Sequence, residues 1–145
     1  MTEHREMVSL GRDGTTFKGL DILRVGEGKP PLSKWVATCT EFTCRCPITK
    51  QPDWAEILVV FHNSMFFVET KSLKLYLETF REVGIFHEHL AQEILDTIVG
   101  SIKSAVGPKG DSTPYSCEVR VKFNLRGGIG VEARALYSDF EEDPK

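Results

Sequence analysis

The sequence predicts an α+β domain in which two helices cover one face of a four-stranded antiparallel sheet. Apolar residues recur every three to four positions in His87–Ala105, which is the period of an amphipathic helix. Apolar and charged residues alternate in Ser116–Asn124, which is the period of a half-buried strand. Along the 145 residues the elements follow in the order ββααββ, a layout that places the helices together on one face of the sheet.

The first third of the chain supplies the first two strands of this sheet. Residues 1–31 are rich in Gly, Lys, Asp and Glu, so we expect an irregular N-terminal arm with a short strand near Leu20–Val25. Leu32–Thr43 and Trp54–Phe61 are short and rich in β-branched and aromatic residues. Such segments fit a pleated, half-buried surface, and both are therefore predicted to be strands.

The two helices occupy the middle of the chain. Thr70 or Ser72 is expected to cap a helix that runs to about Val83, with Gly84 as its stop signal. The second helix, His87–Ala105, has one continuous apolar stripe. That stripe consists of Leu90, Ile94, Ile98 and Ile102.

The last two strands follow a turn-rich loop at residues 107–114. The glycine pair at residues 127–128 marks a tight turn or bulge between Ser116–Asn124 and Ile129–Leu136. A four-stranded sheet of this kind leaves two edges open. Open edges favour edge-to-edge assembly of several copies.

Length and composition indicate one cytoplasmic domain at residues 32–138, followed by a frayed acidic tail at residues 139–145. The net charge of −3 and the pI near 5.8 argue against a nucleic-acid-binding surface. No apolar run approaches the roughly 18 residues of a membrane span, and Met1–Arg12 is too polar for a secretory signal. Four cysteines without the density of a disulfide framework favour a reducing compartment.

The candidate chemistry lies in Glu41–Asp53, which contains one thiol and one carboxylate in a short rigid frame. In an extended chain Cys46 and Asp53 would lie roughly 23 Å apart. Pro47 and Pro52 exclude a helix and favour a loop that doubles back and brings the two groups together. A thiol beside an acid suits a covalent step followed by proton delivery. The alternatives are an inert buried thiol and an aspartate that merely forms a turn.

Four ordered blocks resemble the NADPH-dependent 7-cyano-7-deazaguanine reductases, the nitrile reductases of queuosine synthesis. The blocks are Cys46–Asp53 (CPITKQPD), Glu69–Tyr76 (ETKSLKLY), Phe86–Glu88 (FHE) and Phe123–Ile129 (FNLRGGI). The chain departs from the family pattern in a few places. These are Thr70 for the usual Ser, Cys44 two residues before the nucleophile, Leu125 where Pro is frequent, and the lengthened loop at residues 107–114.

The resemblance implies a tunnelling fold whose subunits assemble into stacked rings, with a decamer expected and active sites between neighbouring subunits. It also implies reduction of a nitrile to a primary amine with two NADPH, on a small 7-deazaguanine substrate. Direct contact with nucleic acid or a membrane is not expected.

The resemblance also assigns roles to single residues. Cys46 is the nucleophile that forms a thioimide, Asp53 passes a proton to the nitrile nitrogen, and His87 is a further catalytic residue. The substrate-binding set is Val68, Glu69, Thr70, His87 and Glu88. A carboxylate suits the N–H donors of a deazaguanine edge. Without the resemblance, Glu88 is equally a first-turn acid favoured by the helix dipole, and His87 a neighbour of the helix cap.

Lys71, Lys74 and Arg126 are the expected cofactor-binding residues, because NADPH carries a 2′-phosphate and a pyrophosphate. The sequence has no G-x-G-x-x-G motif, so a Rossmann-type site is excluded and side-chain cations must bind the phosphates. The alternative for the two lysines is a solvated helix face.

Other functions remain open from the residues alone. Cys39, Cys44 and Cys46 form a C-x4-C-x-C pattern, but structural zinc sites usually use C-x2-C pairs, so no metal is expected. The competing hypotheses are a cofactor-independent amidinotransferase acting on the nitrile base in tRNA, a zinc-dependent pterin or purine enzyme, and a non-enzymatic ring-forming binder.

Overall fold

The computed structural model describes residues 7–11 and 13–141. Its order is β1 (Ile22–Arg24), β2 (Leu32–Arg45), β3 (Pro52–Ser64), β4 (Phe66–Val68), α1 (Thr70–Glu78), α2 (His87–Val106), β5 (Ser116–Arg126) and β6 (Ile129–Ser138). Parts of the predicted arm and tail lie outside the described residues. These are residues 1–6, 12 and 142–145.

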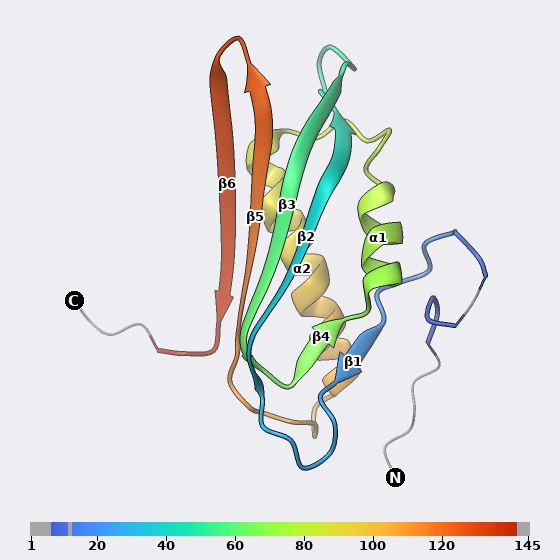
Figure 1. Ribbon diagram of the computed structural model, residues 1–145, viewed down its shortest axis with the longest axis vertical. Coiled ribbons are helices and arrows are strands. Elements are labelled where there is room, and N and C mark those ends of the chain that lie inside the picture. The colour runs from blue at the N-terminus through green and yellow to red at the C-terminus, as the bar shows by residue number, and fades with distance from the viewer. Residues whose placement is uncertain (1–6, 12, 142–145) are drawn as a thin grey trace.

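The α+β class and the antiparallel four-stranded sheet are confirmed. The strand order is β2-β3-β5-β6, with β2 and β6 at the two edges. Both helices cover one face of this sheet (Figure 1). α1 contacts β2, and α2 contacts β5 and β6. Beyond the predicted ββααββ order, β1 and β4 pair to form a separate two-stranded sheet.

The core lies between the sheet and the helices, where the two sequence periods meet. The predicted stripe of α2 is fully buried against the apolar face of β5, which includes Val119, Val121 and Phe123. Cys117 on β5 is likewise a buried thiol. Removal of apolar surface from water contributes about 25 cal/mol for each Å², so this buried layer is the main source of stability. None of the helices in the described part of the chain is long and apolar enough to cross a membrane.

The predicted cap of α1 was wrong. The N-cap residue is Glu69, whose carboxylate accepts hydrogen bonds from the amides of Lys71 and Ser72. Thr70 is the first helical residue. The Ser72 hydroxyl donates to the Glu69 carbonyl and accepts from the Asp21 amide, so it ties the arm to the helix instead of capping it.

The predicted end of α1 near Val83 was also wrong, because the helix ends at Glu78. After it the chain passes through tight turns and is then held by β2. The Arg45 amide donates to the Val83 carbonyl at 2.9 Å, and the Ile85 amide donates to the Arg45 carbonyl at 3.1 Å. A continued helix would use these backbone groups internally, so the bridge to β2 requires the helix to stop early.

Gly84 is therefore a contact residue and not a helix stop. A Cβ atom built at Gly84 would lie 3.0 Å from the Cα atom of Pro47 in the turn that follows β2. The absence of a side chain lets the segment before α2 lie directly against the loop that carries Cys46.

Gly84→Ala is expected to lower the free energy of unfolding by about 1–3 kcal/mol, because the added methyl group overpacks against the Pro47 backbone. Gly100 lies in α2 with open space around it, so Gly100→Ala is the matched control. That control is expected to gain about 1 kcal/mol from helix propensity. Urea titrations of the two variants measure both changes; an equal gain in the two would show that Gly84 has room for a side chain.

Candidate active site

The turn between β2 and β3 places Cys46 at one end of the sheet. The Cys46 amide donates to the Gln51 carbonyl at 2.9 Å, and the Lys50 amide donates to the Cys46 carbonyl at 3.0 Å. Lys50 has φ 62°, the left-handed conformation that lets the chain reverse in so few residues. The predicted doubling back of this segment is confirmed.

The register of the hairpin brings two thiols and one carboxylate together. Cys44 on β2 lies directly opposite Asp53 on β3, and both side chains are buried, with 0% and 2% exposed. Cys46 is two residues beyond Cys44, a spacing that places its side chain on the same face as that of Cys44. The negative charge of Asp53 acts on both thiols, which is consistent with this proximity.

Cys46 has the environment of a nucleophile. Hydrogen bonds from the Thr49 side chain and from the amides of Thr49 and Ile48 lower the pKa of the Cys46 thiol, although Asp53 opposes this. The Thr49 amide nitrogen lies 3.4 Å from the sulfur. Burial instead raises the pKa of Cys44 to about 11 and that of Cys117 to about 12. Of these three thiols, Cys46 ionises first, and the thiolate is the reactive form.

Asp53 is a buried carboxylate with both oxygens engaged. Arg126 Nη1 bonds to Oδ1, and His87 Nε2 lies 3.1 Å from Oδ2. A buried charge is costly unless it is paired, and these two contacts supply the pairing. Three elements therefore converge on one carboxylate: β3 carries Asp53, α2 begins with His87, and β5 ends with Arg126.

Sequence reasoning missed a partner of His87. The imidazole stacks on the ring of Phe123, with centroids 3.4 Å apart and planes inclined by only 10°. The alternation of β5 predicted Phe123 as a core residue, and it is buried. Its place three residues before Arg126 in a matched block was the available signal for a role at the site.

The substrate-binding set that the resemblance implied is divided between two places. Glu88 is exposed in the first turn of α2, beside His87. Val68, Glu69 and Thr70 lie at the start of α1. The turn between β2 and β3, which carries Cys46, instead lies against residues 83–85, beyond the other end of that helix (Figure 1). A helix of 9 residues is roughly 13 Å long. One chain therefore does not bring Glu69 and Cys46 together.

Glu69 is itself 7% exposed and already binds the helix amides at 2.7 and 2.8 Å. Each carboxylate oxygen has two lone pairs, so a further donor can still approach it.

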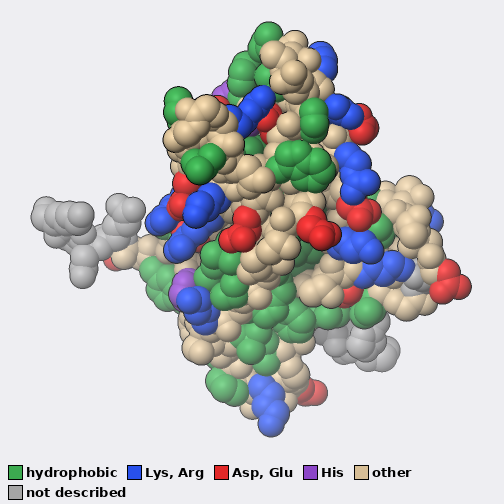
Figure 2. All heavy atoms as spheres, turned by 45° about the horizontal axis from the view of Figure 1, so that its top comes forward, with side chains coloured by type: hydrophobic (Ala, Val, Ile, Leu, Met, Phe, Trp, Pro, Cys, Tyr) green, Lys and Arg blue, Asp and Glu red, His purple; other side chains and the backbone are tan. Residues whose placement is uncertain are grey.

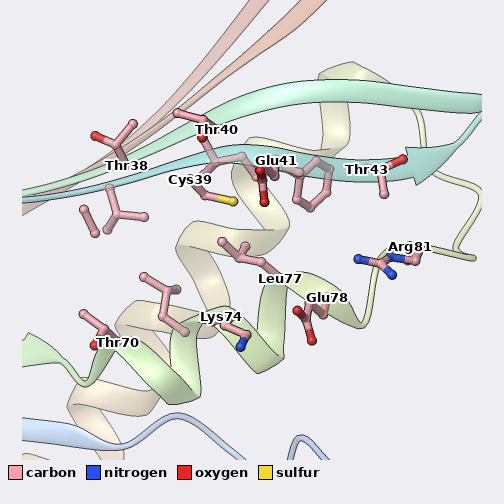
Figure 3. Close-up of a pocket in the computed structure, with 15 residues that line it drawn as sticks. Thr38, Cys39, Thr40, Glu41, Thr43, Thr70, Lys74, Leu77, Glu78 and Arg81 are labelled. Carbon is pink, nitrogen blue, oxygen red and sulfur yellow. The ribbon is translucent and has the colours of Figure 1, made fainter. Parts of the chain in front are cut away.

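The expected cofactor-binding cations are also separated. Lys74 lies on the rim of a groove of about 530 Å³ between β2 and α1, together with Arg81 (Figure 3). Cys39 points from β2 into the same groove, above Leu77 of α1. Lys71 Nζ donates to the Ser9 carbonyl at 3.3 Å, and Arg126 binds Asp53. Arg126 therefore lies beside Asp53, the residue expected to pass on the proton, and apart from Lys71 and Lys74.

The described residues contain no group of three or more His, Cys, Asp or Glu side chains arranged to hold a metal ion. The four cysteines are free thiols, with Cys39 and Cys46 half-buried. His89, for which the sequence indicated no function, is exposed.

The end of the sheet that carries Cys46 also exposes large apolar side chains. The most exposed are Ile48, Trp54, Leu125 and Ile129. Figure 2, which brings this end forward, shows hydrophobic side chains scattered among basic and acidic ones. An apolar surface rimmed by charge is typical of a surface that contacts another protein.

An ionisable cysteine beside a buried carboxylate–imidazole pair is an arrangement that thiol-dependent enzymes use. The chain belongs to the QueF-like protein family, whose model matches residues 52–142.

Several relatives carry one name, NADPH-dependent 7-cyano-7-deazaguanine reductase. The protein from Frankia casuarinae is 52% identical over 99 residues, which is 68% of this chain and 71% of the relative. Those from Syntrophus aciditrophicus and Bacteroides fragilis are 40% and 37% identical and cover 88% and 94% of this chain, and 84% and 87% of the relatives. The crystal structure of the archaeosine synthase QueF-Like in the apo form is similar, with a TM-score of 0.56 and 26% identity over 72% of this chain and 93% of that one.

Thr49→Val is expected to raise the pKa of Cys46 and to slow its alkylation at neutral pH, because the hydrogen bond that contributes most to thiolate stability is lost. Because the pKa is lowered in the folded chain, alkylation of Cys46 should reach half its maximal rate below the ordinary thiol pKa. In the variant this midpoint should move to higher pH. Peptide mass spectrometry after timed iodoacetamide treatment measures the rate at Cys46 alone. Thr43→Val in β2 is the control, and an identical shift there would assign the effect to general disturbance of the hairpin.

Proposed function

We propose that this chain reduces the nitrile of 7-cyano-7-deazaguanine to a primary amine with NADPH, through a covalent thioimide on Cys46. The single observation that carries the proposal is the ionisable Cys46 beside an Asp53 that is held by His87 and Arg126. The names of the relatives and the family membership support the same reaction.

The first step joins the sulfur to the substrate. The Cys46 thiolate adds to the nitrile carbon, a C–S bond forms, and one of the two C–N π bonds is converted into an N–H bond. The proton that leaves the thiol passes through Asp53 to the nitrile nitrogen, and the 3.1 Å contact lets His87 share it. No electrons are gained or lost in this step, and its product is the thioimide.

The second step needs a hydride donor. NADPH, which Lys71 and Lys74 would hold, would supply this chemistry, and two molecules used one after the other would each give one hydride. After the first reduction Cys46 leaves as the thiolate, and the resulting imine is reduced to the amine. Over the whole cycle the substrate gains two hydrides and two protons. Asp53 and His87 hold these protons next to the substrate nitrogen. The burial of Asp53 limits their exchange with water.

The chain offers residues that fit an anionic cofactor. Lys74 is exposed on the rim of the groove between β2 and α1, and Arg81 lies on the same rim. Lys71 is one turn earlier on α1. Cations on one face of a helix suit a pyrophosphate or a 2′-phosphate. Lys71 and Lys74 would therefore hold the phosphates, while the contact of Arg126 with Asp53 favours a role at the carboxylate.

The separation of Glu69 from Cys46 supports an active site shared between subunits. The edge strands β2 and β6 are open for pairing with other copies, and exposed apolar side chains surround the turn that carries Cys46. We infer a tunnelling-fold ring, stacked into a decamer, in which Val68, Glu69 and Thr70 of one subunit bind the base that reacts with Cys46 of its neighbour. Free thiols are consistent with a cytoplasmic location.

The likeness to the archaeosine synthase QueF-Like structure favours a second candidate, an amidinotransferase that adds ammonia to the nitrile base in tRNA. The same Cys46 and Asp53 would form the thioimide, but ammonia would displace the thiolate and no NADPH would be consumed. The net charge of −3 does not favour binding of tRNA.

The first test is the mass of the covalent adduct. Mixing the purified chain with 7-cyano-7-deazaguanine in the absence of NADPH is expected to add the mass of one base to each chain. Cys46→Ala is expected to gain nothing, whereas the control Cys39→Ala keeps the adduct because Cys39 lies in the groove beside α1. An adduct on the Cys46→Ala variant would exclude Cys46 as the nucleophile. Added NADPH then separates the two candidates, since only the reductase oxidises it.

Lys74→Ala is expected to raise the KM for NADPH by about tenfold, because one charge-assisted hydrogen bond to a phosphate is lost. The yield of the nitrile adduct without NADPH should not change. Lys122→Ala, which removes an exposed lysine from β5, is the matched control. Steady-state assays with varied NADPH measure the change, and a loss of adduct in place of a higher KM would assign Lys74 to the substrate site.

A further inference from the structure

The ring of His87 is fixed mainly by contacts that are distant in sequence. His87 is the first residue of α2, and the preceding N-cap residue, Phe86, makes no side-chain cap hydrogen bond. The histidine side chain has two rotatable torsions, so its orientation depends on its neighbours. One neighbour is Asp53, at 3.1 Å from Nε2. A single hydrogen bond fixes one ring atom but leaves the ring free to turn about that bond.

Phe123 removes the remaining freedom. Its ring lies parallel to the imidazole, with centroids 3.4 Å apart and planes inclined by 10°. A flat face in van der Waals contact prevents rotation of the imidazole about the hydrogen bond. The two contacts together fix the ring plane of His87 and thus the direction in which its second nitrogen, Nδ1, points.

Phe123 is itself held rigidly. It is 3% exposed, and on β5 it is paired with Ala55 of β3 on one side and Val131 of β6 on the other. Ala55 lies two residues after Asp53, so the same stretch of β3 supplies the carboxylate and supports the phenyl ring. Arg126 follows Phe123 on β5 and binds the other oxygen of Asp53. β5 therefore contacts both members of the Asp53–His87 pair: Phe123 stacks on His87, and Arg126 binds Asp53.

We propose that Phe123 is a positioning residue that holds the His87 imidazole in the plane needed for proton exchange with Asp53. This inference rests on the proposed function, because it gives the His87 ring a defined task in that reaction. The phenyl ring does not carry a proton or touch the reacting bond. It acts through His87 alone, and this distinguishes it from the other buried aromatic residues.

Phe123→Leu keeps an apolar side chain and removes the flat face. It is expected to lower kcat by about tenfold to a hundredfold, since small misplacement of a reacting group has effects of this size. The KM for the nitrile base should stay within about twofold of the wild-type value. Phe61→Leu is the matched control, because Phe61 is equally buried but packs against Trp35 and Tyr115. Phe123→Tyr retains the flat face and is expected to restore most of kcat.

A double-mutant cycle tests whether Phe123 acts through His87. In the His87→Ala background Phe123→Leu is expected to change kcat by less than about twofold. A further tenfold loss in that background would overturn the proposal, because the phenyl ring would then act on the fold or on another group.

The ring-proton NMR signals of His87 give a readout that needs no substrate. The chain has four histidines, and the spectrum of His87→Ala assigns the signals of this one. Stacking on Phe123 is expected to shift these signals upfield in the wild type and in Phe61→Leu, and the shift should be lost in Phe123→Leu. Unchanged signals in Phe123→Leu would overturn the proposal. If the wild type shows no turnover, the proposed function fails, and these signals alone decide whether Phe123 positions His87.

Discussion

The pairing of the buried Asp53 carboxylate is the interaction on which the rest of the site depends. A charge with 2% of its side chain exposed must be compensated, and both partners come from distant parts of the chain. Arg126 arrives only when β5 is in register with β3, and His87 arrives only when α2 lies across the sheet. The carboxylate is therefore correctly paired only in the complete fold, and the site and the core form together.

A second buried carboxylate organises the start of α1. Asp21 accepts hydrogen bonds from three successive arm amides, those of Val8, Ser9 and Leu10, and its own amide donates to the Ser72 hydroxyl. These bonds fix the arm against the start of the helix, where Glu69 binds the helix amides. The start of α1 is thus held by a polar network that is separate from the pairing of Asp53. The length of the helix then sets the separation of the two groups of proposed functional residues.

The sequence was sufficient for most of the fold because the periods of α2 and β5 are long and regular. The sequence-based prediction failed at the end of α1. Phe80 continues the apolar spacing of the helix, although the helix ends at Glu78 and the chain then turns toward β2. The hydrogen bonds between Arg45 and residues 83–85 are long-range and leave no periodic pattern. The short strand β1 confirms the strand predicted near Leu20–Val25, whereas β4 was not predicted, since three residues contain too little alternation to define a strand.

The site shows the same division between local and long-range information. Cys46 and Asp53 were identified together because one turn joins them, whereas the partners of Asp53 were not, since Arg126 is 73 residues away. The two oxygens of Asp53 consequently differ in a way that no motif shows. An arginine does not give up its proton in a protein, so Oδ1 is held by a permanent charge. Oδ2 faces His87, a group that can both take and release a proton, so in the proposed reaction the proton that Asp53 receives from Cys46 can be shared with His87.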